Sequence, residues 1–375
     1  MKLLVTGSEG FIGKNLVVRL REIDGNDVLT FCRRDGEHKL AGLLAQADVV
    51  FHLAGVNRPL NTSEYATGNV GLTTKLLELI AERRDKTVPV VFTSSSQVQL
   101  ANPYGHSKRS AEDAVHVYAK MSGAPTYIYR LPNVFGKWCR PNYNSAVATF
   151  CHNVARDLPI TVNDPAAPLT LVYIDDVVEE FLRLVRHFSH EPRTWLQGPY
   201  REVTPIYTTT VGDVAAAIRS FKESRASLTT ERVGAGLMRA LYSTYVSYLP
   251  PEAFAYPIKK HMDLRGEFAE VLKTKDSGQF SYFTAHPGVT RGGHYHHTKT
   301  EKFLVVRGRA RFRFRHLLTG ETAEIVTSGD SARIVETAPG WTHDITNIGD
   351  SELIVMLWAN DHFDRERPDT VMAQV

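Results

Sequence analysis

The sequence has little cysteine and no long apolar run. Its three cysteines, Cys32, Cys139 and Cys151, form no Cys-x-x-Cys pair, which excludes a disulfide framework and is typical of a reducing compartment. No apolar run approaches the roughly 20 residues that cross a bilayer. Met1-Lys2 leads straight into an apolar strand and leaves no room for a signal peptide. We therefore expect a cytoplasmic protein without a membrane partner.

An excess of charge of one sign is also missing. Lysine and arginine number 44, aspartate and glutamate 41, and the net charge of +3 is spread along the chain. Nucleic acids and anionic membranes are bound by concentrated positive charge, so we expect neither as a partner. The 43% hydrophobic and 23% charged residues are typical of a soluble globular protein. A length of 375 residues predicts two or three domains.

A glycine-rich turn lies near the N-terminus. Residues 2–6 predict a short buried strand, a Gly-x-x-Gly-x-x-Gly pattern follows, and apolar periodicity predicts a helix ending near Leu20. Glycines let the backbone approach a pyrophosphate, and a helix N-terminus offers free N–H groups to it. The alternative is an ordinary turn between strand and helix. The predicted cofactor contacts here are Gly7, Gly10, Phe11, Ile12 and Gly13.

The choice of nicotinamide cofactor depends on the end of the second predicted strand, residues 28–31. An acidic residue there would bind the ribose hydroxyls of NAD. Arg33 and Arg34 instead suit the 2′-phosphate of NADP through charge-assisted hydrogen bonds, although a solvated loop pair is the alternative. We expect NADPH. The third strand, residues 49–55, ends where the cofactor would cross the sheet and adds His52, Leu53 and Ala54 to the predicted contacts.

Tyr104 and Lys108 lie four residues apart, so one helical turn places both side chains on the same side of a helix predicted to end near Met121. A lysine held there favours the phenolate and would tune the tyrosine for proton transfer near neutral pH. This spacing is common by chance on solvated helices. Its weight comes from the apolar strand upstream, residues 88–93, which ends at three consecutive serines.

Strands alternate with helices over the first three-fifths of the chain, and this pattern predicts a parallel, doubly wound α/β sheet. Residues 126–130 predict a fifth strand and residues 64–84 a further helix. The motifs in this part of the chain are Thr6-Gly7-x-x-Gly10-Phe11-Ile12-Gly13, His52-Leu53-Ala54-Gly55, Ser94-Ser95-Ser96, Tyr104-x-x-x-Lys108, Arg130-Leu131-Pro132-Asn133-Val134-Phe135-Gly136 and Tyr173-Ile174-Asp175-Asp176-Val177. They resemble those of extended short-chain dehydrogenases/reductases acting on nucleotide sugars, over about residues 1–245.

This resemblance implies a Rossmann-like fold and roles for individual residues. A serine that contacts the substrate oxygen joins Tyr104 and Lys108 in the catalytic set, and we assign it to Ser95, with Ser96 as the alternative. The resemblance also implies that Asn133, Lys137 and Arg140 help hold the nucleotide sugar. A surface loop that only closes the domain is the alternative for each of these three residues.

The last third of the chain has a different pattern. Leu249-Pro250-Pro251 is a candidate boundary, because successive prolines end helices and stiffen linkers, so we expect domains 1–250 and 251–375. Short alternating strands follow and predict an all-β barrel. His294 and His296 would share one strand face, Glu301 the next strand and His343 a later one. Three imidazoles and a carboxylate converging in a barrel predict a divalent-metal site, which suits zinc and is also accepted by iron, manganese and nickel.

The spacing of these four residues resembles both motifs of the cupin family. One substrate would explain a reductase and a metal cupin in one chain, because a sugar ketone at C4 accepts hydride and also acidifies the C–H at C3. Four further motifs are spread over the chain: Gly55-Val56-Asn57-Arg58-Pro59, Asn102-Pro103-Tyr104-Gly105, Asp263-Leu264-Arg265-Gly266 and Thr298-Lys299-Thr300-Glu301-Lys302-Phe303. With these motifs the chain resembles, over nearly its whole length, bifunctional enzymes of capsular polysaccharide and O-antigen biosynthesis, on the pathway to UDP-N-acetyl-L-fucosamine. This resemblance implies zinc and C3 epimerisation of a UDP-2-acetamido-2,6-dideoxy-4-keto-L-hexose in the cupin. It also implies NADPH-dependent reduction to the UDP-6-deoxy-L-talosamine derivative.

Two alternatives remain open for the cupin. It could be a structural, sugar-binding or dimerisation module attached to a single-activity NADP-dependent 4-keto-sugar reductase. It could also be an oxygenase with iron at the same four ligands. We expect a UDP-sugar substrate and a homodimer.

Overall fold

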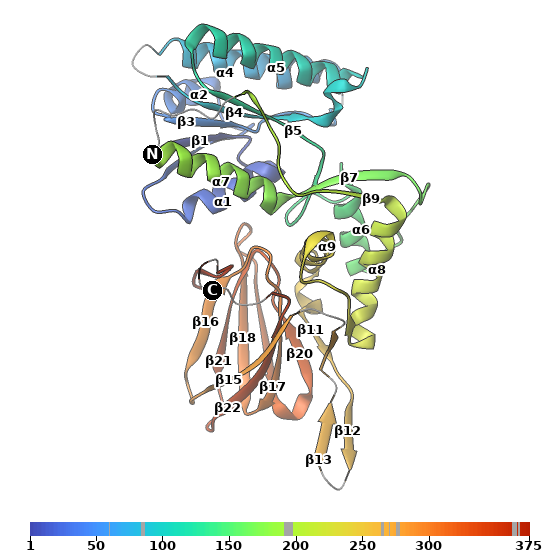
Figure 1. Cartoon of the computed structure of the whole chain (residues 1–375). Helices are drawn as coiled ribbons and strands as arrows, with labels where there is room; N and C mark the ends of the chain where they lie inside the picture. The colour runs from blue at the N-terminus through green and yellow to red at the C-terminus, as the bar shows by residue number, and fades with distance from the viewer. Residues whose placement is uncertain are drawn as a thin grey trace. The chain divides into compact units, whose positions relative to one another are not determined.

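The computed structural model describes residues 1–59, 61–83, 87–190, 198–263, 266–269, 271–274, 278–361, 366 and 368–375 (Figure 1). They form two compact units, Met1–Val134 with Thr170–Thr208, and Phe135–Leu169 with Thr209–Val375. The second unit includes helices that precede residue 250 as well as the C-terminal strands. These compact units do not test where the sequence domains divide, and the division into domains 1–250 and 251–375 stays a prediction.

The first unit contains a six-stranded sheet in which every described pairing is parallel. Strands β3 and β4 are buried along their whole length, as expected where helices cover both faces of a parallel sheet. The predicted doubly wound α/β fold is confirmed. In sheet order the strands are β2 (Asp27–Phe31), β1 (Lys2–Thr6), β3 (Val49–His52), β4 (Val90–Ser95), β5 (Thr126–Leu131) and β8 (Tyr200–Arg201).

Helices lie on both faces of this sheet (Figure 1). One face carries α1 (Phe11–Arg21) and α7 (Ile174–His190), and the other carries α2 (Glu37–Leu44), α4 (Leu72–Ala81) and α5 (Pro103–Ser122). The helix predicted over residues 64–84 is interrupted: α3 (Ser63–Tyr65) leads into the π-helical turn η1 (Ala66–Gly71) before α4. Glycines within that turn weaken regular α-helix. Arg84, its predicted end, lies outside the described residues.

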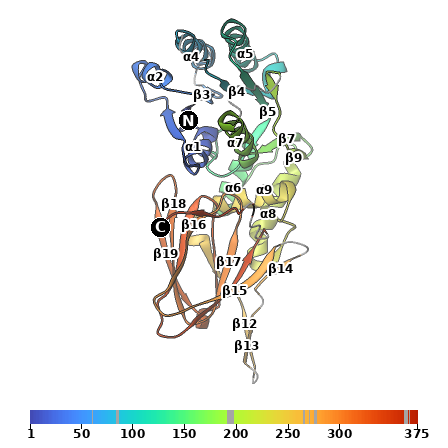
Figure 2. The same cartoon turned by 60° about the vertical axis from the view of Figure 1, so that its left-hand side comes forward.

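The second unit contains two five-stranded sheets with antiparallel pairings, which Figure 2 shows in a turned view. Phe303 and Phe312, from different sheets, pack at 5.6 Å between ring centroids inside the barrel. The predicted all-β cupin architecture is confirmed. One sheet holds β11 (Ala255–Pro257), β20 (Arg333–Glu336), β17 (Glu301–Arg307), β22 (Leu353–Ala359) and β15 (Gln279–Ala285). The other holds β19 (Thr322–Ser328), β18 (Arg309–His316), β21 (Trp341–Asn347), β16 (Thr290–Tyr295) and β23 (Val371–Met372).

Three helices of the same unit, α6 (Ala146–Ala155), α8 (Val211–Ser227) and α9 (Gly236–Ser247), pack on one another and on the barrel. Phe221 contacts Tyr242 at 5.2 Å between ring centroids, and the Ser243 hydroxyl donates to the Thr298 carbonyl at 2.6 Å. Helix α9 begins at Gly236. A glycine at positive φ, here +62°, fits a turn before a helix better than its interior.

The remaining elements are short. They are β6 (Asn133–Phe135), β7 (Pro168–Tyr173) and β9 (Ile206–Thr210) in a three-stranded sheet, the pair β10 (Thr229–Thr230) and β14 (Lys273–Thr274), the hairpin β12 (Lys260–Asp263) and β13 (Gly266–Ala269), and the 3-10 turns η2 (Ser96–Gln99), η3 (Pro251–Phe254) and η4 (Gly329–Ser331). Among the described residues, no helix combines the length and apolarity needed to span a bilayer.

Candidate functional site

The glycine turn after β1 is closely packed against the end of β3. A Cβ on Gly7, which has φ +68°, would lie 2.7 Å from the Ala54 backbone nitrogen. A Cβ on Gly13 would lie 2.1 Å from the Gly7 carbonyl oxygen. The N-cap of α1 is Gly10, whose missing side chain leaves the N–H groups of the first turn without a side-chain cap. A close glycine turn followed by a helix start with free N–H groups is a cradle that can bind a pyrophosphate, and the role of these glycines stays a prediction.

Arg33 and Arg34 follow β2 and are exposed, with 89% and 80% of their side-chain surface accessible. Arg34 pairs with Glu9 of the glycine turn, and Arg33 lies 3.5 Å from Glu64. Both guanidinium groups are thus available for a phosphate, and Arg34 lies next to the turn that would hold the cofactor. Their role in cofactor choice stays a prediction.

His52 is buried and lies between two hydroxyls. Its Nδ1 is 2.7 Å from Thr6 Oγ1 and its Nε2 is 2.8 Å from Thr73 Oγ1. Burial, together with the nearby Lys108, lowers the pKa of His52 to about 3, so the ring is neutral. The imidazole therefore links β1, β3 and α4 inside the first unit, whereas the neighbouring Ala54 backbone contributes to the cradle.

The start of α5 brings Tyr104 to Ser95. Asn102 caps the helix by accepting from the Gly105 N–H at 2.7 Å, and a Cβ on Gly105 would lie 2.4 Å from the Gln97 carbonyl oxygen. The Tyr104 side chain is hydrogen-bonded to Ser95. The other two serines are less suited, because the Ser94 hydroxyl donates to Glu112 and Ser96 is exposed. The geometry therefore favours Ser95 over its alternative.

The expectation that Lys108 lowers the pKa of Tyr104 is wrong for this structure. Burial raises the pKa of Tyr104, and the hydrogen bond from Ser95 offsets this only in part. The Lys108 ammonium donates instead to the Thr93 carbonyl at 2.8 Å and lies 4.9 Å from the Phe92 ring centroid. Burial also lowers the pKa of Lys108 to about 8. Tyr104 is thus protonated at neutral pH, which suits a proton donor.

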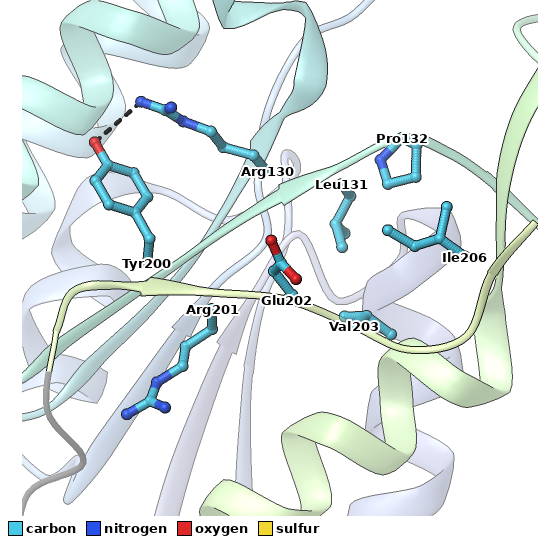
Figure 3. Close-up of a pocket in the computed structure, with 8 residues that line it drawn as sticks. All are labelled: Arg130, Leu131, Pro132, Tyr200, Arg201, Glu202, Val203 and Ile206. Atoms are coloured by element: carbon cyan, nitrogen blue, oxygen red, sulfur yellow. Dashed lines mark hydrogen bonds between the residues drawn. The ribbon is translucent and has the colours of Figure 1, made fainter.

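A buried ionic group next to this site was not predicted. Glu112 accepts from Arg130 at 2.6 Å and from the Tyr200 hydroxyl at 3.2 Å, which joins α5 to β5 and β8. Glu112 lies one helical turn beyond Lys108, and this spacing was the only feature of the sequence from which its place near the site could have been predicted. A cavity of about 230 Å³ adjoins Arg130 at the end of β5 (Figure 3). Its lining includes Tyr200, Arg201 and Glu202 but none of the catalytic candidates.

The residues predicted to hold the nucleotide sugar occupy different settings. Asn133 is exposed in the first unit and donates to the Thr170 carbonyl at 3.2 Å. Lys137 and Arg140 belong to the second unit. Lys137 is buried, and the exposed Arg140 guanidinium lies 5.1 Å from the Tyr143 ring centroid. The role of all three in substrate binding stays a prediction.

The four predicted metal ligands come together inside the barrel. His294, His296, Glu301 and His343 offer ligand atoms that all lie within 4.8 Å of one another. His294 on β16 is directly opposite His343 on β21, and Glu301 begins β17. The Nε2 atoms of His296 and His343 lie 3.1 and 3.4 Å from Glu301 Oε2.

The protonation and burial of these residues fit a divalent metal. Neither ring nitrogen of the buried His343 makes a hydrogen bond of good geometry among the described residues. Burial lowers the pKa of His343, and burial with neighbouring imidazoles lowers the pKa of His294 to about 4. Burial alone would raise the pKa of Glu301, but the adjacent imidazoles hold it well below its usual range. An unprotonated ring nitrogen and an ionised carboxylate are the forms that bind metal, and the pKa directions of His294, His343 and Glu301 agree with this.

Family models match both parts of the chain. The NAD dependent epimerase/dehydratase family matches residues 3–196, and a polysaccharide biosynthesis C-terminal domain matches residues 261–371. Because the first match covers more than half of the sequence, the chain belongs to the NAD dependent epimerase/dehydratase family. The glycine turn, Tyr104 and Lys108 all lie within the matched range.

Full-length relatives are also similar to the chain. The UDP-2-acetamido-2,6-beta-L-arabino-hexul-4-ose reductase of Pseudomonas aeruginosa is 54% identical over 100% of this chain and 99% of its own. The crystal structure of the capsular polysaccharide assembling protein CapF from Staphylococcus aureus is 39% identical, with a TM-score of 0.67 and complete coverage of both chains. The predicted resemblance to capsule-biosynthesis enzymes with this two-part architecture is confirmed. A UDP-glucuronic acid 4-epimerase structure from Bacillus cereus, 22% identical with a TM-score of 0.56, covers 66% of this chain and 99% of that one and shows the fold alone.

Proposed function

We propose that the chain is a bifunctional nucleotide-sugar enzyme. Its first site reduces the C4 ketone of a UDP-2-acetamido-2,6-dideoxy-4-keto-L-hexose, and its barrel epimerises C3 of the same sugar. The observation that supports the reductase is the place of Tyr104 at the start of α5, where its hydroxyl is hydrogen-bonded to Ser95. A relative that is 54% identical over the whole chain is named a reductase of a UDP-hexulose.

The reduction is divided among three side chains. Ser95 and Tyr104 donate hydrogen bonds to the ketone oxygen, and the raised pKa of Tyr104 keeps its proton available until the oxygen becomes an alkoxide. Lys108, whose ammonium donates to the Thr93 carbonyl at 2.8 Å rather than to Tyr104, would contact the cofactor. NADPH, when bound, supplies the hydride. The cradle of Gly7, Gly10 and Gly13 would hold its pyrophosphate, with Arg33 and Arg34 at its 2′-phosphate.

In the barrel, His294, His296, Glu301 and His343 would hold one divalent ion, most simply zinc. When bound, such an ion supplies the positive charge that makes a C–H next to a ketone acidic enough to exchange. The ligand residues keep the site dry and fixed, since three of the four are buried. Product of the C3 step is then the substrate of the reductase, and a UDP-6-deoxy-L-talosamine derivative is the final product.

A single-activity reductase with a structural metal is the second candidate. It is favoured by one observation, that the protein alone supplies four ligand groups, which is the number in structural zinc sites. Glu301→Gln distinguishes the candidates. A structural site would lose its fold with its metal, whereas a catalytic site would keep its fold and lose exchange at C3.

The experiment that tests the proposal is NADPH oxidation by the purified protein with a panel of UDP-4-keto sugars, followed by product stereochemistry. We expect the parent protein to oxidise NADPH with the 4-keto-6-deoxy-L-hexosamine, and we expect Tyr104→Phe to oxidise no NADPH with the same sugar. Tyr282→Phe, at an exposed position on the barrel, is the matched control and should retain full activity. An absence of NADPH oxidation with every 4-keto sugar would refute the reductase.

A further inference from the structure

Residues 368–375 lie against the two strands that carry His294 and His343. Strand β23 pairs with β16, with Met372 opposite His294. The Ala373 N–H donates to the Gly293 carbonyl at 2.9 Å, and the Ala373 carbonyl accepts from the Thr342 hydroxyl at 2.7 Å. This C-terminal segment therefore fixes β16 and β21 to each other at the level of the metal ligands.

Asp369 begins this contact and holds the loop between His296 and Glu301. Its carboxylate accepts from the N–H groups of His297 at 2.8 Å, Thr298 at 2.7 Å and Lys299 at 2.8 Å, and from the Thr298 hydroxyl at 2.9 Å. Three successive backbone donors converging on one carboxylate fix the loop in a single conformation, since hydrogen bonds to a charged acceptor are the strong ones.

The backbone carbonyl of Asp369 also determines which nitrogen of His296 is free. This carbonyl contacts His296 Nδ1, and because a carbonyl can only accept, Nδ1 carries the proton. Nε2 is left as the unprotonated nitrogen, and it points to Glu301 Oε2 at 3.1 Å. A hydrogen bond on the second ring nitrogen is the usual device that orients a metal-binding histidine.

We propose that Asp369 is the positioning residue of the barrel's metal site. Its carbonyl fixes the tautomer of His296, and its carboxylate fixes the loop that joins His296 to Glu301. The inference rests on the proposed metal site. Lys299 gives the loop a further importance, because its ammonium lies 3.4 Å from Glu301 Oε1. A loop released from Asp369 would leave this ammonium free to move relative to Glu301, a ligand the metal needs.

The test is the zinc affinity of the full chain, measured by competition with a chromogenic chelator. Asp369→Asn puts an NH₂ group against backbone donors and should weaken zinc binding roughly 10- to 100-fold, the range for lost outer-shell partners. Thr298→Val removes one of the four bonds and should have a smaller effect. Asp350→Asn, an exposed aspartate on the same barrel, is the matched control and should leave the affinity unchanged.

Two further readouts separate positioning from folding. The visible spectrum of the cobalt-substituted protein should change in Asp369→Asn, because a loop that the carboxylate no longer holds alters the position of Glu301 at the metal. Thermal unfolding of the metal-free proteins measures the fold alone. A variant with a lower metal-free melting temperature but unchanged zinc affinity and cobalt spectrum would overturn the inference. A parent protein that binds no divalent metal would overturn the proposed site, and this inference with it.

Discussion

Glu336→Gln should destabilise the second unit strongly, because the Glu336 carboxylate lies between two cations away from water. One oxygen pairs with the Lys302 ammonium on β17 and the other with the Arg225 guanidinium on α8. Lys302 and Glu336 are each 3% exposed. The Lys302 ammonium also donates to the Tyr256 hydroxyl at 3.1 Å. The amide of glutamine removes the negative charge and leaves both cations buried without a counter-ion.

The expected magnitude follows from that burial. Removal of one partner from a buried ion pair costs about 3–5 kcal/mol, much of it the cost of the charge left behind. We expect a loss in this range for the transition of the second unit. Glu179→Gln is the matched control, since Glu179 also contacts two arginines, Arg19 and Arg186, but is 38% exposed. Exposed pairs contribute about 0–1 kcal/mol.

The assay is urea unfolding at pH 7, followed by tryptophan fluorescence and by circular dichroism so that separate transitions of the two units are detected. A second variant, Lys302→Met combined with Glu336→Leu, should lose less than Glu336→Gln, because it removes the buried pair rather than one partner. The reasoning is refuted if Glu336→Gln and Glu179→Gln lose the same free energy of unfolding.

Three further predictions concern the first unit. Arg34→Ala should raise the KM for NADPH about ten-fold, the effect of about one charge-assisted contact, and leave the KM for NADH unchanged. Steady-state kinetics with both cofactors measures this, and an equal rise in both KM values would contradict it. Gly13→Ala should abolish cofactor binding while the chain stays folded, because the new Cβ would lie 2.1 Å from the Gly7 carbonyl oxygen. Calorimetric titration with NADPH measures the affinity, and an unchanged affinity would contradict this prediction. Lys108→Met should stabilise the cofactor-free protein at pH 7 while it abolishes reduction. The pKa of Lys108 falls from 10.5 to about 8 on folding, so the unfolded chain binds more protons between these pH values. The destabilisation of the folded state by the buried ammonium is therefore complete below pH 8 and absent above pH 10.5. The free energy of unfolding should rise by at most about 3 kcal/mol, reduced by the loss of the hydrogen bond to Thr93. A rise that stays the same between pH 7 and pH 10 would contradict this prediction.

The parts of the site that sequence predicts are those set by local spacing. The glycines of the first turn lie within seven residues, Tyr104 and Lys108 lie one helical turn apart, and the His-x-His spacing brings His294 and His296 together. These periodicities belong to single elements and do not depend on the tertiary fold. The fold class followed for the same reason, because alternating strands and helices give way to consecutive strands near residue 250. The prediction that His294 and His296 share a strand face is wrong in detail, because β16 ends at Tyr295 and His296 follows it.

What sequence could not predict depends on burial and on distant partners. The pKa of Tyr104 is raised by the burial of its hydroxyl, and the Lys108 ammonium donates to the Thr93 carbonyl. Glu112 and Arg130 pair across 18 residues, and Asp369 reaches His296 across 73.

The central claim is that two different chemistries act on one sugar, at Tyr104 and at the barrel ligands. The most direct measurement is deuterium incorporation at C3 of the UDP-4-keto sugar in D₂O, followed by NMR together with NADPH consumption. We predict that Tyr104→Phe incorporates deuterium at the parental rate and consumes no NADPH. We also predict that chelation of the metal from this variant stops incorporation while the fold is retained. Loss of exchange together with reduction in Tyr104→Phe, or full exchange without metal, would contradict the account.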